Sequence, residues 1–335
     1  MNPIVFVGVA AALLAAVAVG LLVRPVMSGR MAWTALVAAA ATAVVTVVVG
    51  RALGLGTLEF LIGIAALALP VSLLVEAAAV ASGAGEFARW LLMLLWGVVV
   101  FPITALVPLT LTAGCVAPDC GFEDFGAALP LVVSSAAYVL LGKPAHLDHT
   151  SDRGFVVGGL LLWFASAVWL THLEGTVDEF TPRIALAAIV GPAAGAVGWL
   201  LVDLLRNTRR DTGQSLMLGL AAGMVATLPG AVSVQVPWSP IVGLLAGGLA
   251  SLVYSLHRVT AAGLAPRWGA TVLVAALVGF VAPAISGETV GVMFSGRAAV
   301  LVVPVLAFFA VATFSVLVSA PVWVLLRRRW ARSRT

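Results

Sequence analysis

Few side chains in this sequence could carry out chemistry, and most of them lie inside or beside long apolar stretches. Glu76 is a carboxylate well inside the apolar run 58–82. A lone carboxylate in such a segment is costly unless it is paired or protonated, so we take Glu76 as a candidate functional residue. The alternative is that its side chain reaches the aqueous end of its helix or hydrogen-bonds a neighbouring helix.

A second group of candidates lies at the end of the apolar run 154–172. His172 ends this run and is close in sequence to Trp163, Trp169 and Glu174. Tryptophan faces can bind cations, and a histidine beside a carboxylate can titrate near neutral pH. Tryptophan and histidine at a membrane boundary also form the ordinary aromatic belt, and we favour that interpretation.

Asp124 stands directly before the apolar run 125–142. A carboxylate at this place can accept hydrogen bonds from the free N–H groups of a helix start, so capping is its expected role.

Cys115 and Cys120 precede Asp124 with four residues between them and are the only cysteines. On the outer side of a membrane we expect them to form a disulfide that braces the loop.

Metal and cofactor chemistry has little support. The polar loop 143–153 contains His146 and His149, but a solvated loop is the better interpretation, and we expect no metal site and no cofactor. The sequence contains neither a nucleophile elbow, a P-loop, a zinc-protease motif nor a dinucleotide fingerprint. The sequence therefore shows no residues that are typical of conventional catalysis, and an enzyme is the less favoured class.

The composition excludes a water-soluble enzyme. Of the 335 residues, 62% are hydrophobic and 10% are charged, whereas soluble domains are near half apolar and a quarter charged. The net charge is +4, but the basic residues separate apolar runs and do not form a nucleic-acid patch. The partners expected from this composition are the lipid bilayer and a small solute.

We predict an all-α integral membrane protein with eleven transmembrane helices, because each crossing needs about 20 apolar residues. The helices are expected at 3–23, 32–54, 58–82, 88–112, 125–142, 154–172, 184–205, 215–235, 238–256, 268–286 and 298–326. Residues 1–335 would form a single transmembrane domain made of two five-helix halves, 3–142 and 154–286, a long last helix and the basic tail 327–335.

An odd number of helices in each half gives the halves opposite topology, which permits an inverted repeat with a solute site between them. The last run would be about 44 Å long as a helix against about 30 Å of hydrocarbon, so it must tilt steeply or cross the surface of a bundle. Small residues such as Gly243, Gly247 and Gly248 predict close helix packing in a compact bundle.

Charge placement predicts the orientation. Of the eighteen Lys and Arg residues, fifteen fall on one side of the expected helices, and Arg51, Arg183 and Arg297 fall on the other. By the positive-inside rule, the amino terminus is outside and the carboxyl terminus is cytoplasmic, in the plasma membrane. Most acidic residues fall on the outer side, where they could attract cations or could be ordinary solvated loops.

Several segments resemble the ammonium transporter (Amt/Rh) superfamily. The segment 122–128, Phe-Glu-Asp-Phe-Gly-Ala-Ala, is similar to the family's Asp-Phe-Ala-Gly-Gly motif, and Trp163-Phe164 to the start of its Trp-Phe-Gly-Phe-Asn motif. Residues 20–24 resemble the end of the family's first helix. The strongest likeness is the run 198–203, 223–229 and 237–248, which resembles helices seven to nine.

This resemblance implies an eleven-helix bundle with inverted halves, a homotrimer and one narrow pathway in each protomer. The functional positions depart from the family. Counting from Asp124, the first pore histidine falls on Val132, and no histidine follows His257 to serve as the second. The gating phenylalanines fall on Ser166 and in the stretch 65–68, and the cation-binding serine falls near Leu170.

A valine cannot carry a proton, whereas imidazoles can relay one near neutral pH. We therefore predict an ammonium-transporter-like channel or transporter with an altered pore, which passes ammonium, ammonia or another small solute. The alternative is a non-conducting sensor or scaffold, or a membrane-embedded enzyme that uses Glu76 or His172. The tail is shorter than the cytoplasmic tails through which the family is regulated, so regulation by a signalling protein is not expected.

Overall fold

The protein is helical throughout the part that the structure, a computed structural model, describes. That part comprises residues 3–23, 29–81, 84–106, 122–141, 153–208, 210–256, 264–288 and 291–332. Within it, extended pairing is limited to one bridge between Val234 and Gly287. The predicted all-α class is therefore confirmed.

The helices follow the apolar runs of the sequence. In the amino-terminal part they are α1 (Pro3–Val23), α2 (Gly29–Ala52), α3 (Leu58–Ala66), α4 (Ala68–Ala81), α5 (Glu86–Leu95), η1 (Trp96–Val100), η2 (Leu129–Val133) and α7 (Ser134–Leu140). Next come α8 (Arg153–His172), α9 (Thr181–Leu205), α10 (Thr212–Thr227), η3 (Val236–Trp238), α11 (Ser239–Tyr254) and α13 (Leu264–Ser286). The last are α14 (Val292–Ser295), η4 (Ala298–Leu301) and α15 (Val302–Arg332).

In the described ranges, nine helical segments are long and apolar enough to cross a membrane. Two further predicted segments contain shorter helices, because 125–142 yields the 12 residues Leu129–Leu140 and 215–235 yields α10 followed by turns. A straight crossing needs about 20 residues. These two segments reach only part of the membrane depth as helix.

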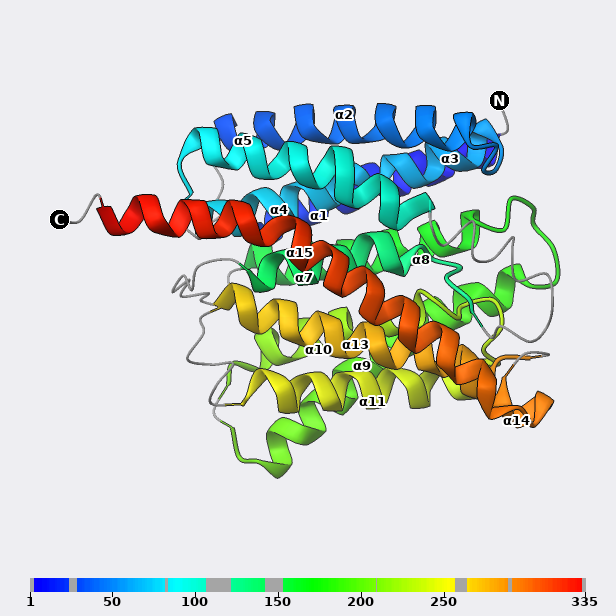
Figure 1. Ribbon diagram of the computed structural model, residues 1–335. Helices are drawn as coiled ribbons and strands as arrows, with labels where there is room; N and C mark the ends of the chain where they lie inside the picture. The colour runs from blue at the N-terminus through cyan, green and yellow to red at the C-terminus, as the bar shows by residue number, and fades with distance from the viewer. Residues whose placement is uncertain are drawn as a thin grey trace.

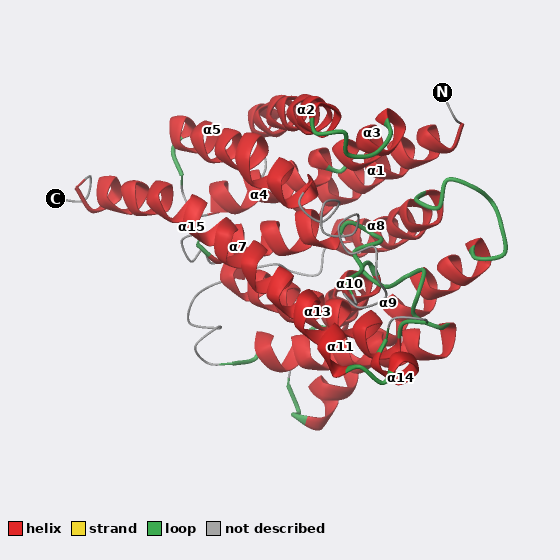
Figure 2. Ribbon diagram, turned by 45° about the vertical axis from the view of Figure 1, so that its right-hand side comes forward, coloured by secondary structure: helices red, strands yellow, loops and turns green. Residues whose placement is uncertain are grey.

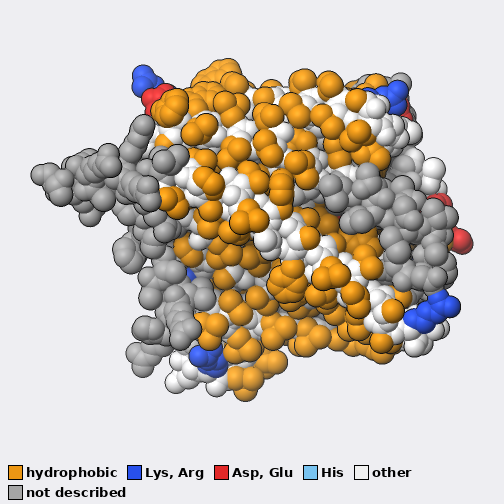
Figure 3. Space-filling model, in the orientation of Figure 1, with side chains coloured by type: hydrophobic (Ala, Val, Ile, Leu, Met, Phe, Trp, Pro, Cys, Tyr) orange, Lys and Arg blue, Asp and Glu red, His pale blue; other side chains and the backbone are white. Residues whose placement is uncertain are grey.

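The outer surface of the bundle suits a lipid environment. Large apolar side chains such as Val44, Leu186 and Phe309 are exposed, at 62%, 48% and 53%. Figure 3 shows apolar side chains across the middle of the visible face, while the charged side chains drawn in colour lie near its two ends. A band of hydrocarbon between two polar ends is the pattern of a membrane protein.

The helices pack side by side as one bundle, which Figure 1 and Figure 2 show from two directions. α15 runs obliquely across it and contacts α5 and α7 on one side and α13 on the other. With 31 residues, α15 is about 46 Å long, which exceeds the hydrocarbon thickness of about 30 Å. The expected tilt of the last helix is visible in this oblique path.

Two segments are wound more widely than an α-helix. In η1 the N–H of Phe101 bonds the carbonyl of Trp96, and in η2 the N–H of Ser134 bonds that of Leu129, each five residues back. Proline lies in or beside both turns, at Pro102 and Pro130. Proline has no N–H and its ring crowds the preceding turn, so a widened turn is one way to keep the helix continuous.

Small residues bring α9, α10 and α11 into close contact. A Cβ at Gly243 would lie 2.0 Å from the carbonyl oxygen of Gly191, and one at Gly247 would lie 1.9 Å from that of Gly195. No real Cβ fits at these distances, so the backbones of α9 and α11 touch only because glycine occupies both positions. This confirms the packing role predicted for Gly243 and Gly247.

Candidate pathway through the bundle

A cavity of about 330 Å³ lies at the centre of the bundle. It is bounded by α1, α4, the η2–α7 segment, α8, α10 and α13. Its lining is dominated by Ala, Val and Leu, and none of the described residues that line it is charged. The cavity is a concave site formed by residues far apart in the sequence.

Four of the predicted pathway residues line this cavity: Val132, Trp163, Ser166 and Trp169. The indole N–H of Trp163 donates to the backbone carbonyl of Ala188 across 3.0 Å, which joins α8 to α9 and fixes the ring. Trp169 is 3% exposed, and its indole N–H has no hydrogen-bond partner among the described residues. The structure thus brings these four positions together around one space.

The hydroxyl groups of the cavity are already occupied. Ser135 donates to the carbonyl of Leu131, Ser166 to that of Trp163 and Thr271 to that of Trp268. The hydroxyl hydrogens are therefore bound within their own helices. Moving an ion from water into such a lining without compensating partners is strongly unfavourable. The cavity is suited to uncharged molecules.

Asp124 caps the start of the η2 segment rather than facing the cavity. Its carboxylate accepts hydrogen bonds from the backbone N–H groups of Ala128, at 2.5 Å, and Leu129, at 3.0 Å. Burial raises the pKa of Asp124 to about 7, while these two N–H groups act in the opposite direction. The expected capping role is present, with Ala127 in the left-handed region at φ 55°.

The segment around Asp124 is tied to the end of α10. The N–H groups of Phe125 and Gly126 donate to the carbonyls of Pro229 and Leu228, at 3.0 and 2.8 Å. A Cβ at Gly126 would lie 2.7 Å from the Leu228 oxygen, so this approach needs glycine. Because Leu228 lines the cavity, the cap and the cavity share one wall.

His172 lies one turn beyond Trp169 and does not line the cavity. Its Nδ1 is 2.6 Å from the carbonyl oxygen of Trp169, and the two rings are 4.5 Å apart. Its Nε2 lies against Gly8 of α1, where a Cβ would be 2.1 Å away. The ring therefore fills a contact between α8 and α1.

Glu76 also lies outside the cavity. One carboxylate oxygen is 2.9 Å from a guanidinium nitrogen of Arg89 on α5, and the side chain is fully buried. The other carboxylate oxygen has no hydrogen-bond partner among the described residues. Of the two interpretations of Glu76, the contact with a neighbouring helix is the one that the structure shows.

A polar cluster surrounds the end of the bundle where Asp124 lies. Arg183 pairs with Glu288 at 2.7 Å and donates to the carbonyl of Ser233 at 2.9 Å. The Ser233 hydroxyl donates to Glu123, and burial raises the pKa of that carboxyl. The hydrogen bond from Arg183 lowers the pKa of Glu288, which also accepts one from Gln235. This cluster joins the ends of α9, α10 and α13.

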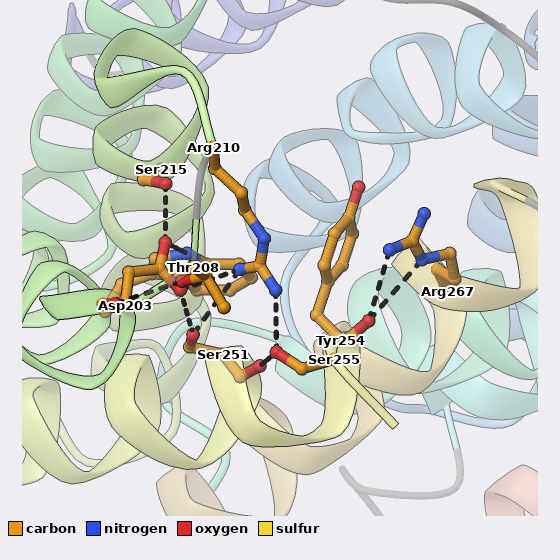
Figure 4. A network of polar contacts seen from close by, with 9 residues as sticks. Asp203, Thr208, Arg210, Ser215, Ser251, Tyr254, Ser255 and Arg267 are labelled. Carbon is orange, nitrogen blue, oxygen red and sulfur yellow. Dashed lines mark hydrogen bonds and ion pairs between the residues drawn. The ribbon is translucent and has the colours of Figure 1, made fainter. Parts of the chain in front are cut away.

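A second polar network lies at the other end of α9, and the sequence interpretation missed it (Figure 4). Asp203 accepts hydrogen bonds from Ser215 at 2.6 Å and from Ser251 and Arg210 at 2.9 Å each. The indole N–H of Trp199 donates to the same carboxylate at 3.1 Å. The network locks α9, α10 and α11 together, and its members are all paired. The sequence did contain one signal for this network, since Asp203 lies near the end of an apolar run and one helical turn after Trp199.

Some predicted features fall outside the described residues. Cys115 and Cys120 do so, and the expected disulfide stays a prediction. The loop histidines His146 and His149 also lie outside the described ranges.

The fold matches that of solved ammonium transporter structures, although no protein-family model matches the sequence. The crystal structure of Saccharomyces cerevisiae Mep2 has a TM-score of 0.72 and 19% identity, covering 96% of this chain and 86% of Mep2. Candida albicans Mep2 gives 0.73 and 20%, covering 99% and 85%. A sensor Amt protein gives 0.71 and 15%, covering 98% and 93%.

Part of the sequence is also similar to ammonium transporters. An ammonium transporter of Mycobacterium tuberculosis is 31% identical over 123 residues, which is 35% of this chain and 26% of that protein. A putative ammonium transporter of Methanothermobacter thermautotrophicus is 29% identical over 187 residues, 51% of this chain and 43% of that protein. The chain is thus similar to ammonium transporters in its fold and in part of its sequence. The matched parts span less than half of either relative.

Two of the positions that the sequence resemblance singles out lie in the lining of the cavity. Val132 and Ser166, which the resemblance aligns with a pore histidine and a gating phenylalanine, both line the cavity. His172 is the single histidine within the described ranges, and it lies outside that lining. Valine and serine are both smaller than the aromatic rings that the resemblance expects at these two positions.

Proposed function

We propose that this chain forms a membrane pathway for a small uncharged solute of the ammonia type. The observation that carries the proposal is the central cavity. The described residues that line it are uncharged, and their hydroxyl groups are bound within their own helices. The relatives are named ammonium transporters, which supports the solute class. The absence of an imidazole at Val132 supports passage without a proton relay.

The arrangement of the lining supports the predicted inverted repeat of five and five helices. In order along the chain, the cavity is lined by the first, third and fifth helical segments of the first half, which are α1, α4 and η2–α7. From the second half it is lined by α8, α10 and α13, again the first, third and fifth. Corresponding helices of two inverted halves would meet in this way around a shared site.

The full topology is part of the same proposal. We propose eleven crossings, in which the short helices Leu129–Leu140 and α10 count as two, with the amino terminus outside and the carboxyl terminus cytoplasmic. A homotrimer is the proposed assembly, because the chain shares the fold of Mep2 and resembles a trimeric family. Each protomer would then have its own pathway, since helices of one chain line the cavity.

Flux and charge measurements on reconstituted protein test the proposal. In proteoliposomes with an internal pH dye, an imposed ammonia gradient should alkalinise the lumen faster than in empty vesicles. Current recorded on a supported membrane should stay at the level of protein-free membranes, because only the neutral species crosses. An ammonium-dependent current, or alkalinisation no faster than in empty vesicles, would contradict the proposal.

A matched pair of variants assigns the flux to the cavity. Ser166→Phe places a ring in the cavity lining and should slow alkalinisation several-fold. Val197→Phe adds a comparable volume on α9, where the side chain is 56% exposed, and should leave the rate unchanged. Equal rates in the two variants would place the pathway elsewhere.

A further inference from the structure

The central cavity is much larger than ammonia requires. Its volume of about 330 Å³ falls within the range of about 300–1,000 Å³ that ligand sites of proteins occupy. A single water needs only about 10–15 Å³ of such space. The cavity therefore has room for a molecule of many heavy atoms.

The cavity is also elongated. Its lining on α8 runs from Phe155 to Trp169, which at about 1.5 Å per residue is about 21 Å of helix. On α1 the lining runs from Ala11 to Val23, about 18 Å by the same measure. A space of this length and volume is narrow, and a linear molecule fits it better than a compact one.

The lining selects for hydrocarbon. Apart from the hydroxyls already bound within their helices, the side chains facing the space are almost all apolar. Water in such a space lacks the two to four polar partners that hold it in protein interiors. An empty apolar space is destabilising because its lining loses contact partners. An apolar occupant needs no polar partners and supplies the contacts that the lining of an empty cavity lacks.

Trp169 offers the occupant a polar group. It is the last residue of α8 in the cavity lining, is 3% exposed, and its indole N–H has no partner among the described residues. Buried N–H groups in proteins are nearly always bonded to an acceptor. Because the described lining residues are uncharged, an uncharged oxygen is the acceptor that matches this donor.

We propose that the cavity binds a single-chain lipid-like molecule, with its hydrocarbon chain along α8 and an uncharged oxygen accepting a hydrogen bond from the Trp169 indole. The inference rests on the proposed function in using the same cavity. It goes further in assigning a second, larger class of molecule to that space. A bound chain of this kind occupies the pathway and slows the passage of ammonia.

Binding of 1-dodecanol to the full chain in lipid nanodiscs tests this inference, with protein-free nanodiscs as the baseline. We expect saturable binding of one dodecanol per chain, counted by native mass spectrometry. Ser166→Phe should weaken it at least about tenfold by filling the space, and the exposed control Val197→Phe should bind like the native protein. Absence of saturable binding, or equal affinity in the two variants, would overturn the proposal.

A second pair isolates the hydrogen bond. Trp169→Phe keeps a ring and removes the N–H, so dodecanol should bind about five- to tenfold more weakly while n-dodecane binds as before. Trp33→Phe changes a tryptophan that is 66% exposed on α2 and should alter neither affinity. Unchanged dodecanol affinity in Trp169→Phe would remove the assigned donor, and loss of n-dodecane binding would show that the ring itself was needed.

The two proposals fail separately. Ammonia flux without dodecanol binding would overturn the lipid-like ligand and leave the pathway in place. Dodecanol binding without ammonia flux would do the reverse. When both hold, adding dodecanol should slow alkalinisation in the native protein several-fold and have no such effect in Ser166→Phe.

Discussion

The carboxylate of Glu76 on α4 lies 2.9 Å from the guanidinium of Arg89 on α5, and the Glu76 side chain is completely buried. The pair joins two helices that follow one another along the chain, and Arg89 is nearly as buried, at 12% exposure. Since neither residue lines the cavity, the pair holds the helical frame and does not touch the proposed solute.

Removing the Arg89 side chain should therefore destabilise the fold strongly. Arg89→Ala leaves a buried carboxylate without its counter-charge, and we expect a loss of about 3–5 kcal/mol in the free energy of unfolding. Thermal unfolding in detergent measures it, with the exposed Arg51→Ala on α2 as the matched control. The double variant Glu76→Ala/Arg89→Ala should recover part of the loss. A double variant as unstable as Arg89→Ala alone would contradict the pairing.

The contact between α9 and α11 gives a test at adjacent positions. Gly247→Ala puts a methyl group 1.9 Å from the Gly195 carbonyl oxygen, and we expect a loss of about 1–3 kcal/mol or failure to fold. Gly248→Ala meets nothing closer than 3.5 Å, so its stability should match the native protein or exceed it slightly. Thermal unfolding of the two variants, which differ by one residue in position, gives the comparison.

The polar cluster at the Asp124 end predicts opposite pH responses at two carboxylates. Burial raises the pKa of Glu123, so its share of stability is full below its ordinary pKa and falls as pH rises through the raised value. The hydrogen bond from Arg183 lowers the pKa of Glu288, so its share is full above the ordinary pKa and falls as pH drops through the lowered value.

Unfolding temperatures measured across the acid pH range should show these opposite responses of Glu123 and Glu288. Relative to the native protein, Glu123→Gln should lose less stability as pH rises, and Glu288→Gln should lose less as pH falls. If both variants changed the pH dependence in the same direction, the assignment of one of the two environments would be wrong.

The Asp203 network predicts a large effect from an isosteric change. Asp203→Asn keeps the shape of the side chain but removes the charge that faces Arg210 and turns one acceptor into a donor toward its partners. We expect a loss of about 2–3 kcal/mol, judged by thermal unfolding. Asp211→Asn is the control, because Asp211 is an exposed helix cap and asparagine caps equally well.

The sequence pattern predicted the helical elements because membrane depth imposes a simple rule, about 20 apolar residues for each crossing. It also predicted the cap at Asp124, which depends on backbone N–H groups only four and five residues away. Gly243 was recognised as a packing residue since only a missing side chain permits such an approach. These features are local or depend on one residue type.

The partners of Glu76 and Asp203 could not be read from the sequence. Arg89 follows Glu76 by 13 residues, and Ser251 follows Asp203 by 48, so each pairing depends on how helices are placed against each other. The cavity is a further case, because side chains from six helical segments line it and no single motif predicts it. Val132 and Ser166 were recognised as candidate pathway residues through the family resemblance. The spacing of apolar residues alone does not single them out.

α15 has a mechanical consequence. It is a single helix from Val302 to Arg332 that contacts α5 and α7 as well as α13, so it is fastened to both sides of the bundle (Figure 1). In a transporter that rocks one half of the bundle against the other, α15 would have to bend, or slide along α5, α7 or α13, in each transport cycle. These contacts of α15 favour the proposed pathway as a stationary conduit, in which the solute moves while the helices keep their places.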